Sequence, residues 1–133
     1  MTEAPSTAVV RVAFPTDGPA GLAALVSPHF GYCQFFTIVE LREGAPVRIT
    51  VQDNPPHSDC ARPVELLLEL GVEALIVRGI GRTPLEACRN RGLPVYICHG
   101  GMVGHQLSAY GAGALGLAST RDLCQSAEVA DIN

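Results

Sequence analysis

The sequence predicts an α/β domain, a three-layer α/β/α sandwich in which helices cover both faces of a mixed five-stranded sheet. One observation and one rule of topology support this class. Strand-like and helix-like segments follow one another in the order β-β-β-α-β-α-β-α along 133 residues, the length of one compact domain. A connection between two buried parallel strands is right-handed and lays its helix on the sheet.

Three strands are expected in the first half of the chain. Residues 9–14 are β-branched and apolar, and they end at the turn residues 15–18, Pro-Thr-Asp-Gly. Residues 34–41 and 46–51 are two further strand-like runs, and the Arg-Glu-Gly-Ala sequence between them is typical of a turn. The second and third strands are therefore predicted to form a hairpin.

Helices and strands alternate in the second half. Residues 53–59 cannot form regular structure, and apolar residues then recur with helical spacing from Val64 until the helix stop at Gly71. Residues 74–77 are typical of a buried strand. The next helix is expected at Thr83, which opens a Thr-Pro-Leu-Glu capping box with proline at the first helical position.

This second helix is predicted to end at Gly92, and residues 94–97 form the last expected strand. A third helix carries Val103 and Leu107 on its apolar face and ends at Gly111.

The chain is accordingly divided into three parts. Residues 1–8 are expected to be disordered, residues 9–115 to form the domain, and residues 116–133 to be a C-terminal tail. The tail holds at most one short helix, capped by Ser119 or Thr120.

The composition excludes several classes of protein. Hydrophobic residues make up 47% of the chain and charged residues 17%, which argues against disorder, and no apolar run approaches the roughly 20 residues that span a bilayer. The net charge is −4 and the nine basic residues, all arginine, are scattered, so neither nucleic acid nor membrane is expected as a partner. The absence of lysine excludes a Schiff-base lysine and a Walker A loop.

The first residues predict a cytoplasmic location. They are acidic and polar, where a secretory leader would be basic and then apolar. The five cysteines are then expected to be reduced thiols, because a disulfide scaffold needs an even number in a smaller chain.

The predicted strand directions bring four loops, 15–33, 52–61, 78–83 and 98–104, to one edge of the sheet. Open α/β sheets bind ligands outside the carboxyl ends of their strands. The side chains with ligand chemistry are concentrated in these loops or at their margins: His29, Cys33, His57, Cys60, Cys98 and His99, with His105 one turn into the third helix. Cys88, in a helix, and Cys124, in the tail, lie elsewhere.

Four of these residues are candidate metal ligands. The pairs His29-x3-Cys33 and His57-x2-Cys60 could together hold one tetrahedral soft ion such as zinc or copper, or an iron-sulfur centre. The alternative is that they are ordinary loop and core residues, because a free cysteine usually behaves as a small buried hydrophobe. For Cys88 and Cys98 this second interpretation is favoured.

Two glycine pairs at the same edge are candidate anion sites. Gly79 and Gly81 precede the helix that contains Thr83, and Gly100 and Gly101 precede the third helix, beside His99. Backbone N–H groups at a helix N-terminus favour anions. The alternative is that glycine only permits a tight turn from strand to helix.

Several short motifs follow one another along the chain. They are Ser27-Pro28-His29-Phe30-Gly31, Asp53-Asn54-Pro55, Leu70-Gly71-Val72, Ile76-Val77-Arg78-Gly79-Ile80-Gly81 and Gly92-Leu93-Pro94-Val95-Tyr96. In this order they resemble the dinitrogenase iron-molybdenum cofactor biosynthesis family, the NifX-like domain that also ends NifB-type proteins. The resemblance covers about residues 9–115.

The resemblance implies a ribonuclease-H-like α/β/α sandwich without nuclease chemistry. It also implies a small carrier or chaperone that holds an iron-sulfur or molybdenum-containing cluster, with metallocluster donor and acceptor proteins as partners. His29 matches the family histidine and is carried over as ligand or anchor, beside Gly31. Cys33 and Cys60 depart from the general family pattern, and a link to nitrogen fixation is not required.

Catalysis is not expected. Metal-dependent phosphoryl transfer needs several carboxylates around the ion, and the first strand has none. A nucleophile pair, such as Cys33 or Cys98 with His29 or His99, lacks any known local signature. Two interpretations stay open: a metallocluster carrier, and a metal-free regulatory or protein-interaction module that uses the same edge loops. A monomer or weak homodimer is expected in either case.

Overall fold

The computed structural model describes residues 9–55 and 61–119. Within them the elements are β1 (Val10–Thr16), the 3-10 turn η2 (Gly21–Ala23), β2 (Phe35–Arg42), β3 (Ala45–Asp53), α1 (Arg62–Glu69), β4 (Ala74–Val77), α2 (Arg82–Asn90), β5 (Val95–Ile97), α3 (Val103–Gly111) and β6 (Gly116–Leu117). None of the helices in these two ranges has the length and apolar character needed to cross a bilayer.

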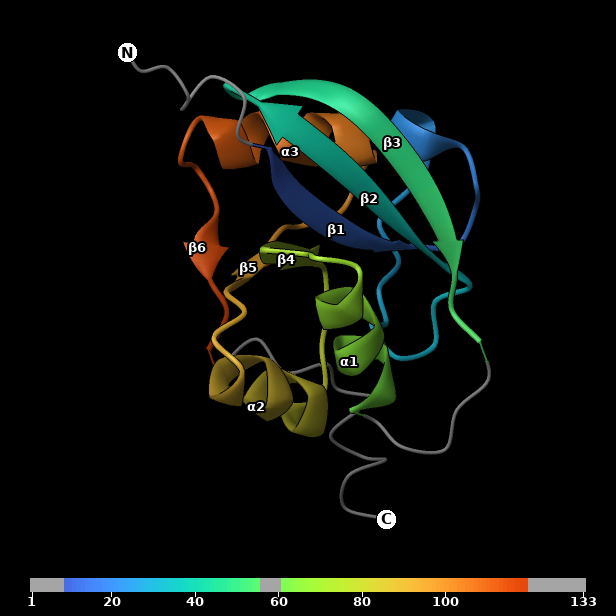
Figure 1. Cartoon of the computed structure of the whole chain (residues 1–133), viewed down its shortest axis with the longest axis vertical. Coiled ribbons are helices and arrows are strands. Elements are labelled where there is room, and N and C mark those ends of the chain that lie inside the picture. Colours follow the sequence, from blue (N-terminus) through green and yellow to red (C-terminus); the bar gives the residue numbers. More distant parts are fainter. Residues whose placement is uncertain (1–8, 56–60, 120–133) are drawn as a thin grey trace.

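The described strands form one mixed sheet in the order β3-β2-β1-β4-β5-β6 (Figure 1). β2 is antiparallel to both β1 and β3, which confirms the predicted hairpin, whereas β4 is parallel to β1 and to β5. The predicted number of five strands is wrong, because a sixth strand, β6, pairs antiparallel with β5. Two residues are too few to show the alternation that identifies a strand.

β6 also lies beyond residue 115, where the domain was expected to end. It is held by pairing rather than by its own side chains: Ala118 N donates to Val95 O at 2.8 Å. Thr120 and the residues after it lie outside the described part of the chain, so the division into segments 1–8, 9–115 and 116–133 stays a prediction.

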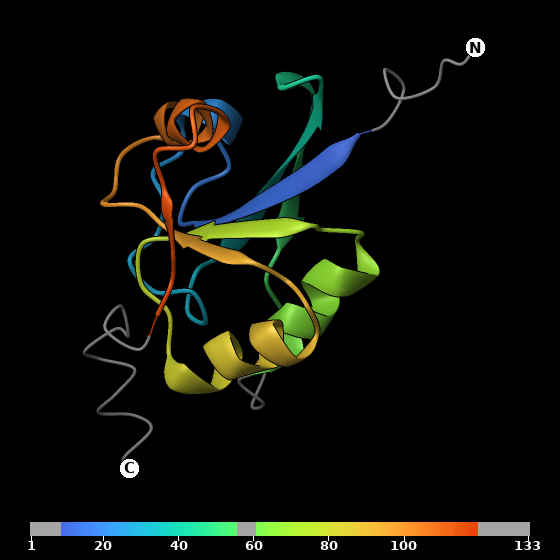
Figure 2. The same cartoon turned by 90° about the vertical axis from the view of Figure 1, so that its left-hand side faces the viewer.

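Helices cover both faces of the sheet (Figure 2). On one face, α1 and α2 pack through Leu67 and Leu85 onto residues such as Leu75 of β4. On the other face, α3 and η2 pack onto residues such as Ile76. Successive side chains of a strand point to opposite faces, so the fully buried β4 serves both cores. The α/β class is confirmed, whereas the ribonuclease-H-like assignment stays a prediction.

The predicted helix stops are confirmed. Gly71 and Gly92 both have positive φ, +79° and +75°, the left-handed conformation that favours glycine. After Gly71, Val72 N donates to Leu67 O at 3.0 Å, and after Gly92, Leu93 N donates to Cys88 O at 2.9 Å. These bonds satisfy carbonyls that a helix end leaves unpaired.

Two local predictions are wrong. The Thr83 capping box does not form: α2 begins at Arg82, with Gly81 as its N-cap and no side-chain cap. Pro84 is then the third helical residue, which is tolerated because N–H groups of the first turn have no partner within the helix. β1 continues to Thr16 instead of ending at residue 14, and Pro15 fits because β4 pairs only with Val12 and Ala13.

Candidate functional site

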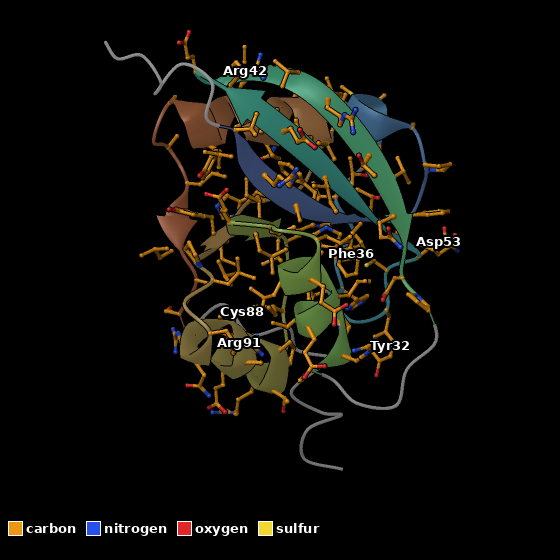
Figure 3. All side chains as sticks on the ribbon, viewed as in Figure 1. Tyr32, Phe36, Arg42, Asp53, Cys88 and Arg91 are labelled. Carbon is orange, nitrogen blue, oxygen red and sulfur yellow. The ribbon has the colours of Figure 1, made fainter. Side chains whose placement is uncertain are left out.

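The four loops that were expected at one edge of the sheet are connected to strand ends that lie together at that edge. Thr16 at the end of β1 pairs with Phe35 at the start of β2, and Phe35 pairs with Asp53 at the end of β3. β4 and β5 run parallel to β1 and end on the same side. Figure 3 shows Asp53 at this end of the hairpin and Arg42 at the other. We call this side the carboxyl edge.

The chain leaves the carboxyl edge in different directions from neighbouring strands. After β4 it enters α2, on one face, whereas after β1 and β5 it enters η2 and α3, on the opposite face. Such a reversal is a topological switch point, where open α/β sheets bind their ligands. The connections after β4 and β5, which contain the two glycine pairs, therefore flank the position that the topology favours for a ligand.

Residues 24–30, which we call the crossing segment, tie these connections together. Val26 N donates to Gly101 O at 3.0 Å, and Phe30 N donates to Gly79 O at 3.2 Å. Ser27 N donates to Pro15 O at 2.7 Å. The segment is thus bonded to the chain at the ends of β1, β4 and β5, and it contains most of the motif that includes His29.

His29 is half-buried and its backbone is fixed by Ser27. The buried Ser27 hydroxyl accepts a hydrogen bond from His29 N at 3.2 Å and donates to His29 O at 3.3 Å. With Phe30 anchored on Gly79, the backbone on both sides of His29 is held. This local bonding explains why the Ser-Pro-His-Phe sequence forms a defined turn here rather than a strand.

Asn54, which is not among the predicted site residues, organises the next stretch of the same loop. Its amide Nδ2 donates to Cys33 O at 2.8 Å and to Gly31 O at 3.4 Å. Its backbone N–H donates to Gln34 O at 3.0 Å. The available signal was an asparagine directly after a strand and before proline, which is typical of a residue that hydrogen-bonds a neighbouring loop.

Cys33 is a buried thiol in the core beneath α1. Its Sγ donates to Phe30 O at 3.2 Å and its side chain is 3% exposed. Burial, reinforced by the negative charge of Asp17, raises the pKa of the Cys33 thiol to about 12. The thiol is therefore neutral at physiological pH, and its loss of a proton would have to accompany metal binding.

The other described cysteines are also buried. Cys88 lies on α2 (Figure 3), and burial raises the pKa of its thiol to about 12. Burial raises the pKa of the Cys98 thiol as well, although the N–H of Gly100 and the charge of Arg78 oppose that shift. Both positions agree with the interpretation of these cysteines as small core residues.

Only two of the four predicted metal ligands, His29 and Cys33, lie within the described residues. His57 and Cys60 lie outside the described residues. Within residues 9–55 and 61–119, no three His, Cys, Asp or Glu side chains are close enough together to hold a metal ion. The set His29, Cys33, His57 and Cys60 therefore stays a prediction.

The two glycine pairs differ in whether their backbone conformation requires glycine. Gly100 and Gly101 have φ of +106° and +109°, so a tight turn explains them. The first N–H of α3, from Val103, is already used by Ala24 O at 2.9 Å. Gly81, in contrast, has φ −78° and ψ 167°, which any residue adopts. Backbone conformation therefore explains the glycines before α3 but not Gly81, and both anion sites stay predictions.

Comparisons with known proteins match most of this chain. The model of the dinitrogenase iron-molybdenum cofactor family matches residues 8–113. The uncharacterized protein MJ0580 of Methanocaldococcus jannaschii is 29% identical over 100 residues, which make up 72% of this chain and 80% of that protein.

Solved structures also share the fold. The NMR structure of TM1290 from Thermotoga, a proposed NifB protein of the DUF35 family, has 31% identity and a TM-score of 0.69, covering 81% of this chain and 92% of that chain. The apo form of the orange protein from Desulfovibrio gigas has 21% identity and a TM-score of 0.72, covering 82% and 92%. The range 8–113 includes the crossing segment and both glycine pairs.

Proposed function

The chain belongs to the dinitrogenase iron-molybdenum cofactor family, and from that premise we propose that it is a small carrier that holds a metallocluster at the carboxyl edge until delivery. The family is associated with iron-molybdenum cofactor biosynthesis and metallocluster binding, and its members bind cofactors rather than catalyse reactions. The cluster is cargo: iron-sulfur or molybdenum-containing, or a single soft metal ion such as zinc or copper.

One observation supports this site above all others. The crossing segment is hydrogen-bonded to Gly79 O and Gly101 O, on either side of the switch point, and His29 lies within it. A half-buried imidazole on a fixed backbone is suited to bind or orient a metal, because little entropy is lost on binding.

The remaining site residues have subsidiary roles in this proposal. Gly31, Gly79 and Gly81 allow close approach of the backbone, and Thr83 lies in the first turn of α2, whose dipole favours negative charge. His99, Gly100 and Gly101 border the cargo from the β5 side. Cys33, His57 and Cys60 would supply the soft ligands.

The partners follow from the carrier role. A protein that does not make its cluster must receive it from a donor and pass it to an acceptor protein, so both are proposed as partners in the cytoplasm. A monomer or weak homodimer would leave the carboxyl edge accessible to them.

Metal analysis of protein made without oxygen in its own host tests the proposal. Wild-type protein should carry stoichiometric metal and show thiolate-to-metal charge-transfer absorption, whereas His29→Ala should carry much less with an unchanged circular dichroism spectrum. His105→Ala, which changes an exposed histidine on α3, is the matched control and should keep the metal.

The cysteine variants extend this experiment. Cys33→Ser and Cys60→Ser should lose metal because thiolates form the stronger bonds, and Cys88→Ser and Cys124→Ser should not. Equal loss in all five cysteine variants would show adventitious binding by thiols. Full retention in the His29, Cys33 and Cys60 variants would refute the site.

A second candidate function is a metal-free regulatory or interaction module that uses the same loops. The burial and neutral state of the Cys33 thiol favour it. Wild-type protein that never carries metal, even from its own host, would select this alternative.

A further inference from the structure

Arg78 is an exposed arginine directly after β4, and its side chain lies across the backbone of Gly100, after β5. A Cβ added to Gly100 would come within 3.2 Å of Arg78 Nε, 3.4 Å of its Cδ and 3.6 Å of its Cζ. The φ of +106° favours glycine at position 100, and a larger residue there would also require the Arg78 side chain to shift. This contact places the Arg78 side chain beside the Gly100 backbone, next to the switch point.

The guanidinium group of Arg78 is not paired within the described part of the chain. The ion pairs there join Arg11 to Glu40 and Arg62 to Glu65, and no carboxylate or carbonyl group accepts a hydrogen bond from Arg78. An arginine has five N–H donors in a fork that matches oxygen-rich or sulfur-rich anions. The donors of the Arg78 guanidinium group are therefore available to a ligand at this edge.

The charge pattern around Arg78 supports an anionic ligand. Residues 27–34, 78–83 and 98–104 contain Arg78, Arg82, His29 and His99 but no aspartate or glutamate, although the whole chain has 13 acidic and only nine basic residues. Among the described residues at the same edge, the carboxylates are Asp17, directly after β1, and Asp53, at the end of β3. The β4–β5 side of the edge is thus locally positive on an acidic protein, and the N-terminus of α2 adds to this field.

Building on the proposed function, we propose that Arg78 selects the cargo by its negative charge. The cargo is an oxo- or sulfido-metal anion, or a cluster of net negative charge, and the Arg78 guanidinium donates charge-assisted hydrogen bonds to its oxygen or sulfur atoms. Gly100 is also a positioning residue, because its lack of a side chain leaves room for Arg78. His29 and the thiols would bind metal, whereas Arg78 would recognise the outer atoms of the cargo.

Binding of two molybdenum anions to the full-length apo protein tests this inference. Molybdate presents oxygen atoms and tetrathiomolybdate presents sulfur atoms, so their relative affinities by equilibrium dialysis show which class the site prefers. Arg78→Gln should lower the affinity for the preferred anion at least tenfold. This is the loss expected from one charge-assisted hydrogen bond of about 1.5–3 kcal/mol. Arg91→Gln, the same charge change in an exposed arginine just after α2, should have little effect.

A double-mutant cycle tests the role of Gly100. Gly100→Ala should weaken anion binding in the wild-type background but should add little to Arg78→Gln, since its effect passes through the arginine. A purely structural role would give the same loss in both backgrounds, and that result would overturn the role of Gly100.

The role of Arg78 is refuted if Arg78→Gln binds both anions as tightly as wild type does. It is also refuted if Arg91→Gln loses as much anion affinity as Arg78→Gln. It also fails if wild-type protein carries metal from its host but binds neither anion, and in that case the proposed carrier function stands. Protein that carries no metal from its host would refute the carrier function itself.

Discussion

The two ends of α2 use similar residues in different ways. At its C-terminal end, Gly92 has positive φ and closes the helix, and Arg89 Nη2 donates to Ala118 O at 3.1 Å. At its N-terminal end, Gly81 has an ordinary conformation and the nearby Arg78 has no hydrogen-bond or ion-pair partner in the described part of the chain. The fold therefore explains Gly92 and Arg89 at the C-terminal end. It does not explain Gly81 and Arg78 at the N-terminal end in the same way.

The hollow at the C-terminal end strengthens this contrast. A groove of about 440 Å³ lies there, lined mainly by apolar residues of α2, β5 and β6 such as Leu85, Val95 and Leu117. The apolar residues of this lining offer no side-chain ligand for a metal ion and no side-chain donor for an anion. The donors of Arg78 and the imidazole of His29 lie instead at the carboxyl edge, where we propose that the cargo binds.

Alkaline pH should produce the largest change in stability. Burial keeps the thiols of Cys33 and Cys88 protonated up to about pH 12, whereas in the unfolded chain they titrate near 9.0. The unfolded state therefore loses protons first as pH rises, and each thiol should lower the free energy of unfolding by up to about 1.4 kcal/mol per pH unit between these values. Urea unfolding at several pH values measures this.

The serine variants provide the control for that experiment. Cys33→Ser and Cys88→Ser should each make the alkaline decline less steep by a similar amount. An identical slope in wild type and both variants would show that these thiols are not protonated in the folded protein as described.

At neutral pH, the two thiols should differ. Cys88→Ser places a hydroxyl in the apolar core under the sheet and should cost about 1–3 kcal/mol of unfolding free energy, with unchanged metal content. Cys33→Ser should cost less, because its hydroxyl can still donate to Phe30 O, but it should lower the metal content. Chemical denaturation and elemental analysis of the same samples distinguish the two. Equal stability loss with equal metal loss would remove the distinction.

The glycines at the two ends of α2 should separate stability from binding. Gly92→Ala forces alanine into a left-handed conformation and should cost about 1–2 kcal/mol, without changing metal content. Gly81→Ala should cost less than about 1 kcal/mol at the helix N-cap, yet lower metal content. Thermal denaturation and metal analysis check this, and a stable Gly92→Ala variant would contradict the account of the helix stop.

The arginines should give the smallest effect on stability. Arg89→Ala removes one hydrogen bond and should cost about 0.5–1.5 kcal/mol. Arg78→Gln removes no intramolecular bond and should leave the urea midpoint within experimental error. A clear loss of stability in Arg78→Gln would show that its charge is used within the fold.

Much of the fold could be predicted from the sequence because its signals are local. Proline and glycine mark turns, and Gly71 and Gly92 end helices because few other residues adopt positive φ. The order of elements then fixes the strand directions and so the carboxyl edge. β6 could not be predicted, since two residues have no periodicity and this strand exists only through its pairing with β5.

The site was less predictable, because burial and side-chain contacts are set by tertiary packing. The sequence places Cys33 in an edge loop but does not show that its thiol points into the core and bonds Phe30 O. The Thr83 capping box fits the sequence pattern, yet the helix starts earlier, at Arg82. The contact between Arg78 and Gly100 joins two loops 22 residues apart in the chain, and no sequence pattern reports it.

Anomalous diffraction from crystals of the metal-loaded protein, recorded at the absorption edge of its metal, tests the central claim most directly. We expect an anomalous peak at the carboxyl edge, beside His29 and between the chain segments that follow β4 and β5. A peak in the groove between α2 and β6, or on the surface away from His29, would contradict it.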